Sequence, residues 1–470
     1  MTTSLRPCAT GVFAVLLSAT LAAGQTSPAS PQPTSASEAA SAGVRSATQV
    51  TPNEPLPDNV RRPYRGLFAP PADPSVSTQS LDVTFNLSGA YDDDSYANDA
   101  TDVSLYRQSG WYAGASAGLA YSRPGERLAF AAGGDAGLNW YDTRDDMLGA
   151  YRARAALSVA AARRTRVRAA QSFAYAPEYR LALFGAPLTL PGALDPFGAV
   201  VPDLDLYRLR NYRTGSELSL TQGVGRRSSL EAAYALLVAD YTDDRFDYRA
   251  QSGGGRFLHQ LTRHANVRLG YFYNVAGYLQ RGTARDQRVH NIDAGIDYGR
   301  ALSFSRRTSV AFSTGSAVLV RDDLSRPQAN SDLVYHLIGS AHVRHEIART
   351  WTAQAGYRRG VDFHEGFNDP FAVDAVNGSI AGFASRRVRL GAAADYARGT
   401  IGIDTSNRFE SLSATAGLEY ALSRNYAVYG RYLYYRYDFD NDVALDPRFL
   451  RALHRQGARF GLTASFPLVR

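Results

Sequence analysis

The sequence has a single cysteine, no lysine, and no long apolar run beyond its first 24 residues. A membrane-spanning helix needs about 18 or more consecutive apolar residues, so none is predicted after residue 24. The one cysteine, Cys8, lies in a stretch typical of a cleavable secretory signal, with Arg6 as its positive residue, an apolar core, and small residues before Gly24. Cleavage of residues 1–24 would remove the cysteine, and with it any disulfide or thiolate metal site. An exported protein is predicted, either soluble or a membrane β-barrel.

Because lysine is missing, arginine alone carries the positive side of the formal net charge of +7. Its planar guanidinium is suited to carboxylate and phosphate groups. The chain also contains 29 tyrosines and 21 phenylalanines, and only 20% of its residues are charged. This composition favours antiparallel strands over a helical fold.

The chain divides into three parts. Residues 25–78 are rich in Ser, Pro, Ala and Thr and bury too little apolar surface to fold, so they are predicted to be a disordered periplasmic linker. Residues 79–470 show strand-like alternation instead. In residues 128–140, Leu128, Phe130, Leu138 and Trp140 share one face, and small or polar residues occupy the other. Helical spacing of apolar residues is not sustained anywhere.

Short basic turns interrupt these strands at fairly regular intervals, and long acidic connections lie between them. The turns are SRPGER (122–127), ARRTR (162–166), GRRSS (225–229), LTRHA (261–265), SRRTS (305–309), ARTW (348–351), SRRVR (385–389) and SRNY (423–426). Short turns at one end and long loops at the other are typical of an outer-membrane barrel. Eight turns plus an opening and a closing strand predict an all-β, antiparallel, up-and-down transmembrane β-barrel of about 18 strands, with 16 as the alternative.

A soluble sandwich or propeller would also alternate apolar and polar residues, but its loops would not divide into a short basic set and a long acidic set. Tyrosine and tryptophan also gather near the expected strand ends, as membrane-interface girdles require. The girdle residues expected are Trp111, Tyr112, Trp140, Tyr141, Tyr175, Tyr241, Tyr298, Trp351 and Tyr396.

The stretch LSGAYDDDSYA, residues 87–97, resembles the opening strand of the beta-barrel porin type of outer membrane beta-barrel proteins, which tends to read Gly-Tyr-Asp-Asp-Asn. Here Ala90 is inserted before Tyr91, and Asp94 stands where the group has Asn. The resemblance covers the region from Leu81 to Arg470 only as a pattern. Members of this group are associated with polysaccharide export, so the resemblance implies export of a surface polysaccharide or exopolysaccharide. The final residue, Arg470, departs from the terminal aromatic common in such barrels.

If the apolar face meets lipid, the opposite face lines a water-filled lumen in which arginine is prominent, and surplus arginine attracts anionic solutes. Each of these charges could instead only pair with a neighbour inside the wall. The lumen and selectivity candidates are Arg152, Arg154, Arg168, Arg268, Arg344, Arg358, Arg389, Arg431, Asp135, Glu217, Asp293, Asp297 and Glu419.

The third long connection, residues 176–207, is unusually apolar and rich in proline. Such a loop is costly in water and is expected to pack against something. Folding into the barrel as a constriction is the preferred interpretation, and capping the mouth or touching a neighbouring barrel is the alternative. Its contact residues would be Tyr179, Arg180, Phe184, Phe197 and Asp203.

No enzymatic activity is predicted, because the eight histidines are scattered along the chain without the Ser-His or Asp-His constellation that a barrel phospholipase or protease needs. His342 and His345 are three residues apart on one strand and so lie on opposite faces, which argues against a two-histidine metal site. Asp92, Asp93, Asp94, Asp99 and Asp102 lack the pattern of a calcium-binding loop and are interpreted as the outer rim of the first strand, with a loose divalent-cation contact near the lipopolysaccharide surface as the alternative. No cofactor, metal or catalytic residue is expected.

The sequence therefore predicts a channel in the outer membrane of a Gram-negative cell that conducts hydrophilic material, with polysaccharide export as the first choice. A general or sugar-selective diffusion porin is one alternative, and a surface-adhesion or structural barrel without an open pore is the other. The expected partners are outer-membrane lipid and lipopolysaccharide, the barrel-assembly machinery and a periplasmic polysaccharide-export protein, and no nucleic acid.

Overall fold

The computed structural model describes residues 79–93, 110–141, 146–176, 179–180, 205–207, 210–242, 247–278, 285–302, 305–320, 333–348, 350–362, 364, 367, 370–401, 407–440, 443 and 451–469. These residues form strands and turns, with no helix among them. The predicted signal peptide (1–24) and linker (25–78) lie outside this set. No helix in the described part of the chain is long and apolar enough to cross a membrane.

The strands differ little in length, and most have 12 to 18 residues. They are β1 (Ser80–Asp93), β2 (Gly110–Arg123), β3 (Leu128–Tyr141), β4 (Asp146–Ala162), β5 (Thr165–Ala176), β6 (Tyr179–Arg180), β7 (Asp205–Tyr207), β8 (Asn211–Gly223), β9 (Ser228–Tyr241), β10 (Tyr248–Gln260), β11 (Ala265–Tyr278), β12 (Arg285–Leu302), β13 (Ser305–Val320), β14 (Leu333–Ile347), β15 (Trp351–Asp362), β16 (Phe371–Phe383), β17 (Val388–Ile401), β18 (Arg408–Ala421), β19 (Tyr426–Phe439) and β20 (Ala452–Val469).

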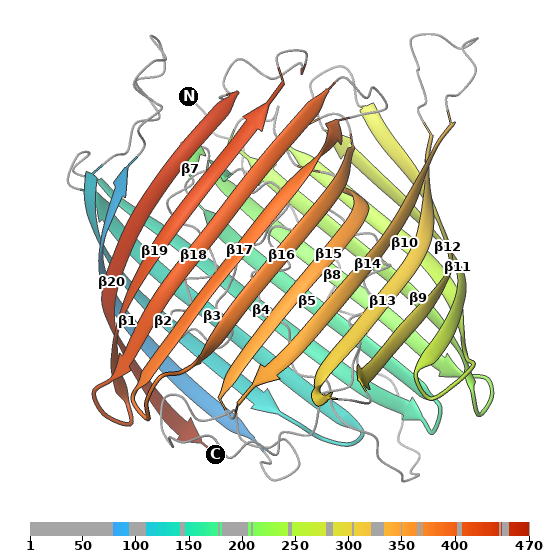
Figure 1. Ribbon diagram of the computed structural model, residues 1–470, viewed down its shortest axis with the longest axis horizontal. Helices are drawn as coiled ribbons and strands as arrows, with labels where there is room; N and C mark the ends of the chain where they lie inside the picture. The colour runs from blue at the N-terminus through green and yellow to red at the C-terminus, as the bar shows by residue number, and fades with distance from the viewer. Residues whose placement is uncertain are drawn as a thin grey trace, which may run out of the picture.

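Eighteen of these strands form one closed antiparallel sheet. Each strand pairs with its neighbours along the chain, and β5 pairs directly with β8. The sheet closes because β1 pairs with β2 on one side and with β20 on the other. Figure 1 shows the strands tilted around the barrel, with the first strand beside the last. The predicted barrel of eighteen strands is therefore confirmed.

The two ends of the barrel differ as predicted. The short connections lie at the lower end in Figure 1, where the last strand also ends. Seven of the eight predicted turns coincide with these connections. The prediction at residues 305–309 is wrong, because β13 begins at Ser305 and Ser309 already pairs with Arg344 of β14. The polar composition of this strand end, which lies at the rim, resembles that of a turn.

The strands are long enough to cross a membrane. A strand of 14 residues such as β11 rises about 3.3 Å per residue, so at a tilt of about 40° it spans roughly 35 Å along the barrel axis. This length exceeds the apolar band of an outer-membrane barrel, which is about 25 Å tall. Both rims therefore extend beyond the hydrocarbon layer.

Candidate functional site

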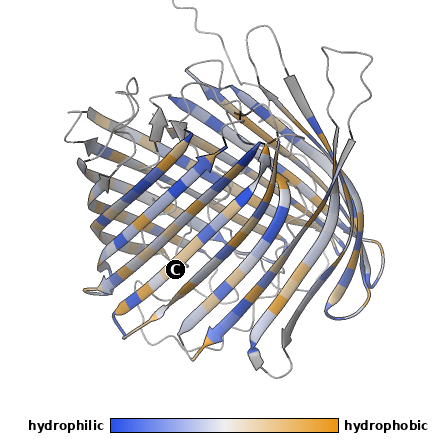
Figure 2. Cartoon of the chain, turned by 45° about the horizontal axis from the view of Figure 1, so that its top comes forward, coloured by the Kyte–Doolittle hydropathy of each residue, from blue (hydrophilic) through white to orange (hydrophobic). Residues whose placement is uncertain are grey.

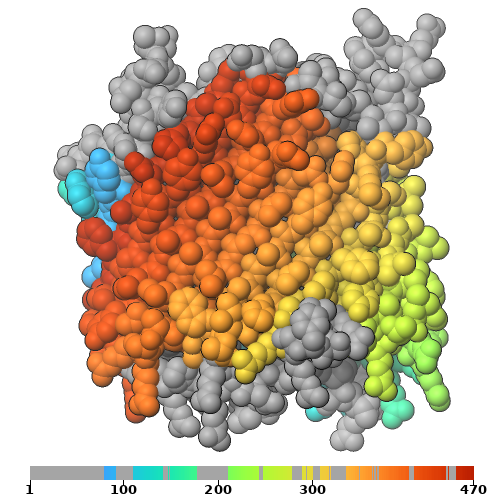
Figure 3. Space-filling model, viewed as in Figure 1, coloured from blue at the N-terminus to red at the C-terminus, as the bar shows by residue number. Residues whose placement is uncertain are grey.

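The barrel wall has an apolar outer face and a mixed inner face. On the outer face Leu269, Leu337 and Tyr335 are 61%, 69% and 71% exposed. Residues of opposite parity, such as Arg268 and Asn274 in β11, are 1% and 2% exposed and face inward. Figure 2 shows the resulting alternation of apolar and polar residues along the strands, and Figure 3 shows the strands packed side by side as a continuous wall. Apolar exposure on this scale fits contact with lipid.

Aromatic side chains reinforce the outer face near the strand ends. Trp111 lies between Tyr91 and Phe460, with ring centroids 5.3 Å and 6.3 Å away. Tyr175 lies 4.9 Å from Tyr151 and 5.0 Å from Tyr212. Trp111 and Trp140 are 57% and 42% exposed, as expected of girdle residues.

Two of the predicted girdle residues whose side chains the structure describes face the interior instead of lipid. Tyr112 and Tyr241 are only 4% and 3% exposed and lie on the inner face. Tyr112 follows Trp111 directly, and neighbouring residues of a strand point to opposite faces, so both cannot meet lipid. Proximity to a strand end was therefore not enough to assign a girdle position.

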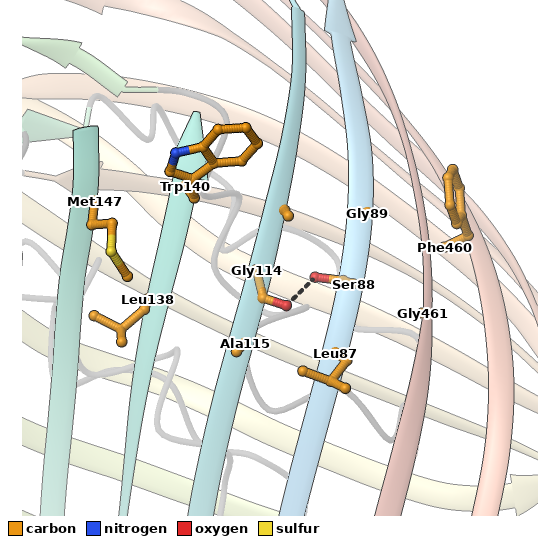
Figure 4. Close-up of a pocket in the computed structure, with 11 residues that line it drawn as sticks. Leu87, Ser88, Gly89, Gly114, Ala115, Leu138, Trp140, Met147, Phe460 and Gly461 are labelled. Atoms are coloured by element: carbon orange, nitrogen blue, oxygen red, sulfur yellow. Dashed lines mark hydrogen bonds between the residues drawn. The ribbon is translucent and has the colours of Figure 1, made fainter. Parts of the chain in front are cut away.

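The outer face also carries a shallow apolar groove of about 530 Å³ across β1, β2, β3, β4 and β20. Figure 4 shows Trp140, Met147 and Leu138 along one side of this groove and Phe460 on the other, with the small residues Gly114 and Ala115 between them. The Ser88 hydroxyl donates a 3.5 Å hydrogen bond to the carbonyl oxygen of Gly114. This lining fits a lipid chain and offers little to a hydrophilic solute.

The predicted lumen candidates all occupy the inward parity of their strands. The side chain of Asp293 lies outside the described residues, so only its strand position is known. Among the described strand residues of inward parity, arginines outnumber carboxylates. The arginines are Arg152, Arg154, Arg166, Arg168, Arg213, Arg256, Arg268, Arg307, Arg344, Arg358, Arg389, Arg431, Arg455 and Arg459, and the carboxylates are Asp82, Asp135, Glu217, Glu231, Asp297, Glu346, Asp362, Asp395 and Glu419.

Several of these charges form pairs across neighbouring strands. Arg152 donates to Asp135 at 2.9 Å, and Arg256 donates to Glu231 at 2.8 and 2.9 Å. Arg358 binds Asp362 of its own strand with both terminal nitrogens. The pairs keep the inner wall polar while limiting the cost of burying charge. Arg344 is more open, at 46% exposed, and lies 3.8 Å from Glu346.

One carboxylate serves two arginines near the short-turn end. Glu419 of β18 lies 3.3 Å from Arg389 of β17 and 3.6 Å from Arg431 of β19. The Arg431 guanidinium also lies over the ring of Tyr429 at 5.4 Å. Two arginines share one carboxylate here, so this part of the wall has a local positive excess.

Arg268 has a different environment because its side chain is fully buried within the wall. Its guanidinium donates to Asp297 at 2.6 Å, to the Ser313 hydroxyl at 2.9 Å and to the Thr314 carbonyl oxygen at 2.5 Å. These acceptors flank an irregularity where the register of β12 and β13 shifts between Ile292 and Asp297. Arg268 thus holds three strands together at a bulge.

A glycine makes this arrangement feasible. A Cβ atom on Gly295 would lie 1.9 Å from the Thr314 carbonyl oxygen and 3.1 Å from a terminal nitrogen of Arg268. No side chain fits at that distance, so the strands can approach each other here only with glycine at this position.

The inner face changes character toward the long-loop end, where aromatic side chains form a compact cluster. Phe371 lies 4.9 Å from Phe367 and 5.2 Å from Phe409, and Phe367 lies 5.7 Å from Phe439. These four rings, which we call the outer aromatic cluster, are each 6% exposed or less. Phe367 belongs to the connection between β15 and β16, so a loop residue closes over the inner wall at this level.

His364 of the same connection packs against the cluster, with its ring centroid 4.9 Å from that of Phe371. Burial lowers the pKa of the His364 imidazole to about 4 from its ordinary 6.5, and the nearby Arg358 cation lowers it further, whereas Asp362 opposes the shift. The neutral imidazole is therefore the stable form at neutral pH.

The inward aromatic residues were missed by the sequence reasoning, which assigned aromatic residues to lipid. Tyr435 and Tyr437 alternate with exposed Arg436 in β19, a parity that could have identified them as inward-facing. The predicted constriction residues lie elsewhere. Phe184, Phe197 and Asp203 fall outside the described residues, as do the side chains of Tyr179 and Arg180.

The backbone of this segment is described at its two ends only. There β6 pairs with β7 in a separate two-stranded ladder. Its predicted role as a constriction remains a prediction. No group of three or more metal-binding side chains occurs within the described part of the chain.

No protein-family model matches the chain, and no curated protein sequence is significantly similar to it. Membership of the polysaccharide-export-associated group therefore remains a prediction.

Solved structures with similar folds are outer-membrane barrels. OccAB4 of Acinetobacter baumannii has 10% identity and a TM-score of 0.40 over 83% of this chain and 99% of its own. OccK1 (OpdK) of Pseudomonas aeruginosa has 11% identity and a TM-score of 0.41 over 83% and 98%. The FrpB iron transporter of Neisseria meningitidis has 7% identity and a TM-score of 0.41 over 83% and 81%. Likeness this distant carries no conclusion about what this chain transports.

Proposed function

We propose that this protein is an outer-membrane channel that conducts hydrophilic solutes and prefers anions. The observation that carries the proposal is the inner wall, where arginines outnumber carboxylates among the described inward-facing residues. A transmembrane β-barrel with a polar interior is the architecture of diffusion channels in outer membranes. Rings of arginine raise the local concentration of anions in such a pore.

The positions of the inner-wall arginines support a direct role for them in selecting anionic solutes. Arg389 and Arg431 share Glu419 near the short-turn end, and Arg344 is nearly half exposed in the same half of the barrel. A solute that enters from this side meets guanidinium groups before it reaches the outer aromatic cluster. Forked guanidinium donors bind carboxylates and sulfates more specifically than a diffuse positive field does.

The outer aromatic cluster supports the proposal of a gate in the pore at the long-loop end of the barrel. Phe367 comes from a connection between strands and packs on Phe371 and Phe439 of the inner wall. Hydrophobic constrictions gate pores by excluding water. Opening then requires Phe367 to leave the cluster.

An acidic polysaccharide chain is the finer proposal for the solute, and the same arginines support it. Planar-bilayer conductance of the refolded protein tests both levels of the proposal. A conducting barrel that is blocked by an acidic oligosaccharide, but not by a neutral one of equal length, favours polysaccharide export over general diffusion. Deletion of residues 180–200 tests the predicted constriction in the same assay, because an unchanged conductance would exclude it.

A surface-adhesion barrel without a pore is the competing function. It predicts no conductance from the wild-type protein or from a variant in which the outer aromatic cluster is opened. The absence of any channel in both proteins would overturn the proposed function.

A further inference from the structure

Four of the short turns share one backbone geometry. In each, the first two turn residues donate their N–H groups to the carbonyl oxygen of the first residue in the next strand. The donors and acceptors are Val224 and Gly225 to Ser228 at 3.1 and 3.2 Å, Leu261 and Thr262 to Ala265 at 2.9 and 3.2 Å, Ala384 and Ser385 to Val388 at 3.0 and 3.4 Å, and Leu422 and Ser423 to Tyr426 at 2.9 and 3.1 Å.

Hydroxyl groups fix three of these turns further. Ser385 accepts from the N–H groups of Arg387 and Val388 at 3.3 and 3.1 Å. Ser423 accepts from Asn425 and Tyr426 at 3.2 Å each, and Thr262 accepts from His264 at 3.2 Å. These side-chain bonds substitute for backbone partners and hold the turns in shape.

Each of the four turns presents an exposed arginine at its third position. These residues are Arg226, Arg263, Arg386 and Arg424, and we call them the rim arginines. The other described turns add exposed arginines at the same end of the barrel, namely Arg127, Arg163 and Arg164. Among the turn residues that the structure describes, Glu126 is the single carboxylate. This rim therefore carries a nearly uniform positive charge.

The first residue of the same turns shows what environment the arginines meet. Val224, Leu261 and Leu422 are 51%, 50% and 48% exposed. By strand alternation they continue the row of outer, lipid-facing residues, for example Leu418 and Tyr420 before Leu422. An apolar residue two positions before an arginine suits the boundary between acyl chains and headgroups, where arginine keeps its charged end in the polar layer. A soluble partner would not account for these exposed apolar side chains.

We propose that the short-turn rim binds anionic phospholipid headgroups in the adjacent leaflet of the membrane. The apolar first residue of each turn lies among the acyl-chain carbons next to the headgroups, and the rim arginine two positions later donates to a lipid phosphate. The repeated turn geometry sets this spacing around the barrel. The inference depends on the barrel spanning a membrane and is independent of whether it conducts.

The test is the lipid selectivity of the reconstituted full-length protein, measured by electron spin resonance with spin-labelled lipids in phosphatidylcholine bilayers. The association of labelled phosphatidylglycerol is compared with that of labelled phosphatidylcholine. One variant carries Arg226→Gln, Arg263→Gln, Arg386→Gln and Arg424→Gln. The matched control carries Arg210→Gln, Arg249→Gln, Arg398→Gln and Arg408→Gln, which remove the same charge from exposed residues nearer the long-loop end.

The wild type is expected to favour phosphatidylglycerol by about fivefold at each contacted site at low salt, and to lose this preference as salt rises. The rim variant is expected to lose most of it, and the control variant is expected to retain it. Heat-modifiable migration on gels checks that each variant is folded. Equal losses in the two variants, or no preference in the wild type, would overturn the proposal, whatever the conductance of the protein.

Discussion

Replacing Arg268 with alanine should destabilise the barrel more than any exchange of an exposed arginine. The Arg268 side chain has no solvent exposure, and the side chain of its partner Asp297 is 12% exposed. The change removes three donated hydrogen bonds and leaves the Asp297 carboxylate buried without this partner. Breaking a buried ion pair by removing one partner costs about 3–5 kcal/mol.

The free energy of unfolding can be measured by urea titration in phospholipid vesicles, followed by tryptophan fluorescence. Arg436→Ala is the matched control, because Arg436 is 51% exposed and lies 3.8 Å from Glu410 and 3.7 Å from Asp438. Its loss should change the stability by at most about 1 kcal/mol. Arg268→Lys should fall between the two, since one ammonium cannot reproduce the forked contacts. If Arg268→Ala costs no more than Arg436→Ala, the bulge does not depend on this network.

Two further predictions concern the connection between β15 and β16. Because burial holds the pKa of His364 at about 4, below its ordinary 6.5, the unfolded chain binds more protons between these values. The contribution of neutral His364 to the free energy of unfolding is therefore fully present above pH 6.5. It should be lost, by up to about 3 kcal/mol, as the pH falls through 4. The same urea titration checks this, and His364→Phe should lack this loss of stability over that range; an equal slope in both proteins would assign the effect to another group. Phe367→Ala removes two aromatic contacts worth together about 1–3 kcal/mol and should increase the open probability in single-channel recordings, whereas the lipid-facing control Leu337→Ala should not; an unchanged open probability would exclude Phe367 from gating.

Strand alternation predicted the barrel well because each wall residue meets either lipid or the interior. In β11, for example, Leu269 is exposed on the outer face and the adjacent Arg268 is buried on the inner face, and this alternation recurs along the strand. Turn positions were predicted nearly as well, since each short turn carries arginine among polar residues. The number of strands then followed from the number of turns.

What the sequence could not show depends on strand register and on contacts from loops. Arg268 and Ser313 are 45 positions apart and meet only because of a register shift between β12 and β13. Alternation within one strand contains no information about such a shift. The contact of Phe367 with Phe439 joins the connection between β15 and β16 to the end of β19, far away in the chain. Tyr112 was misassigned for a simpler reason, because its position near a strand end was considered without its parity.

The central claim is a pore whose arginines select anions, and the reversal potential across a planar bilayer under a potassium chloride gradient tests it most directly. The wild-type protein should show anion selectivity, and Arg389→Glu with Arg431→Glu should reduce or invert it, because the pair flanks Glu419 on the inner wall. The control Arg398→Glu with Arg408→Glu, on the outer parity, should leave the reversal potential unchanged. A cation-selective wild-type channel, or a selectivity that both double variants leave unchanged, would contradict the account.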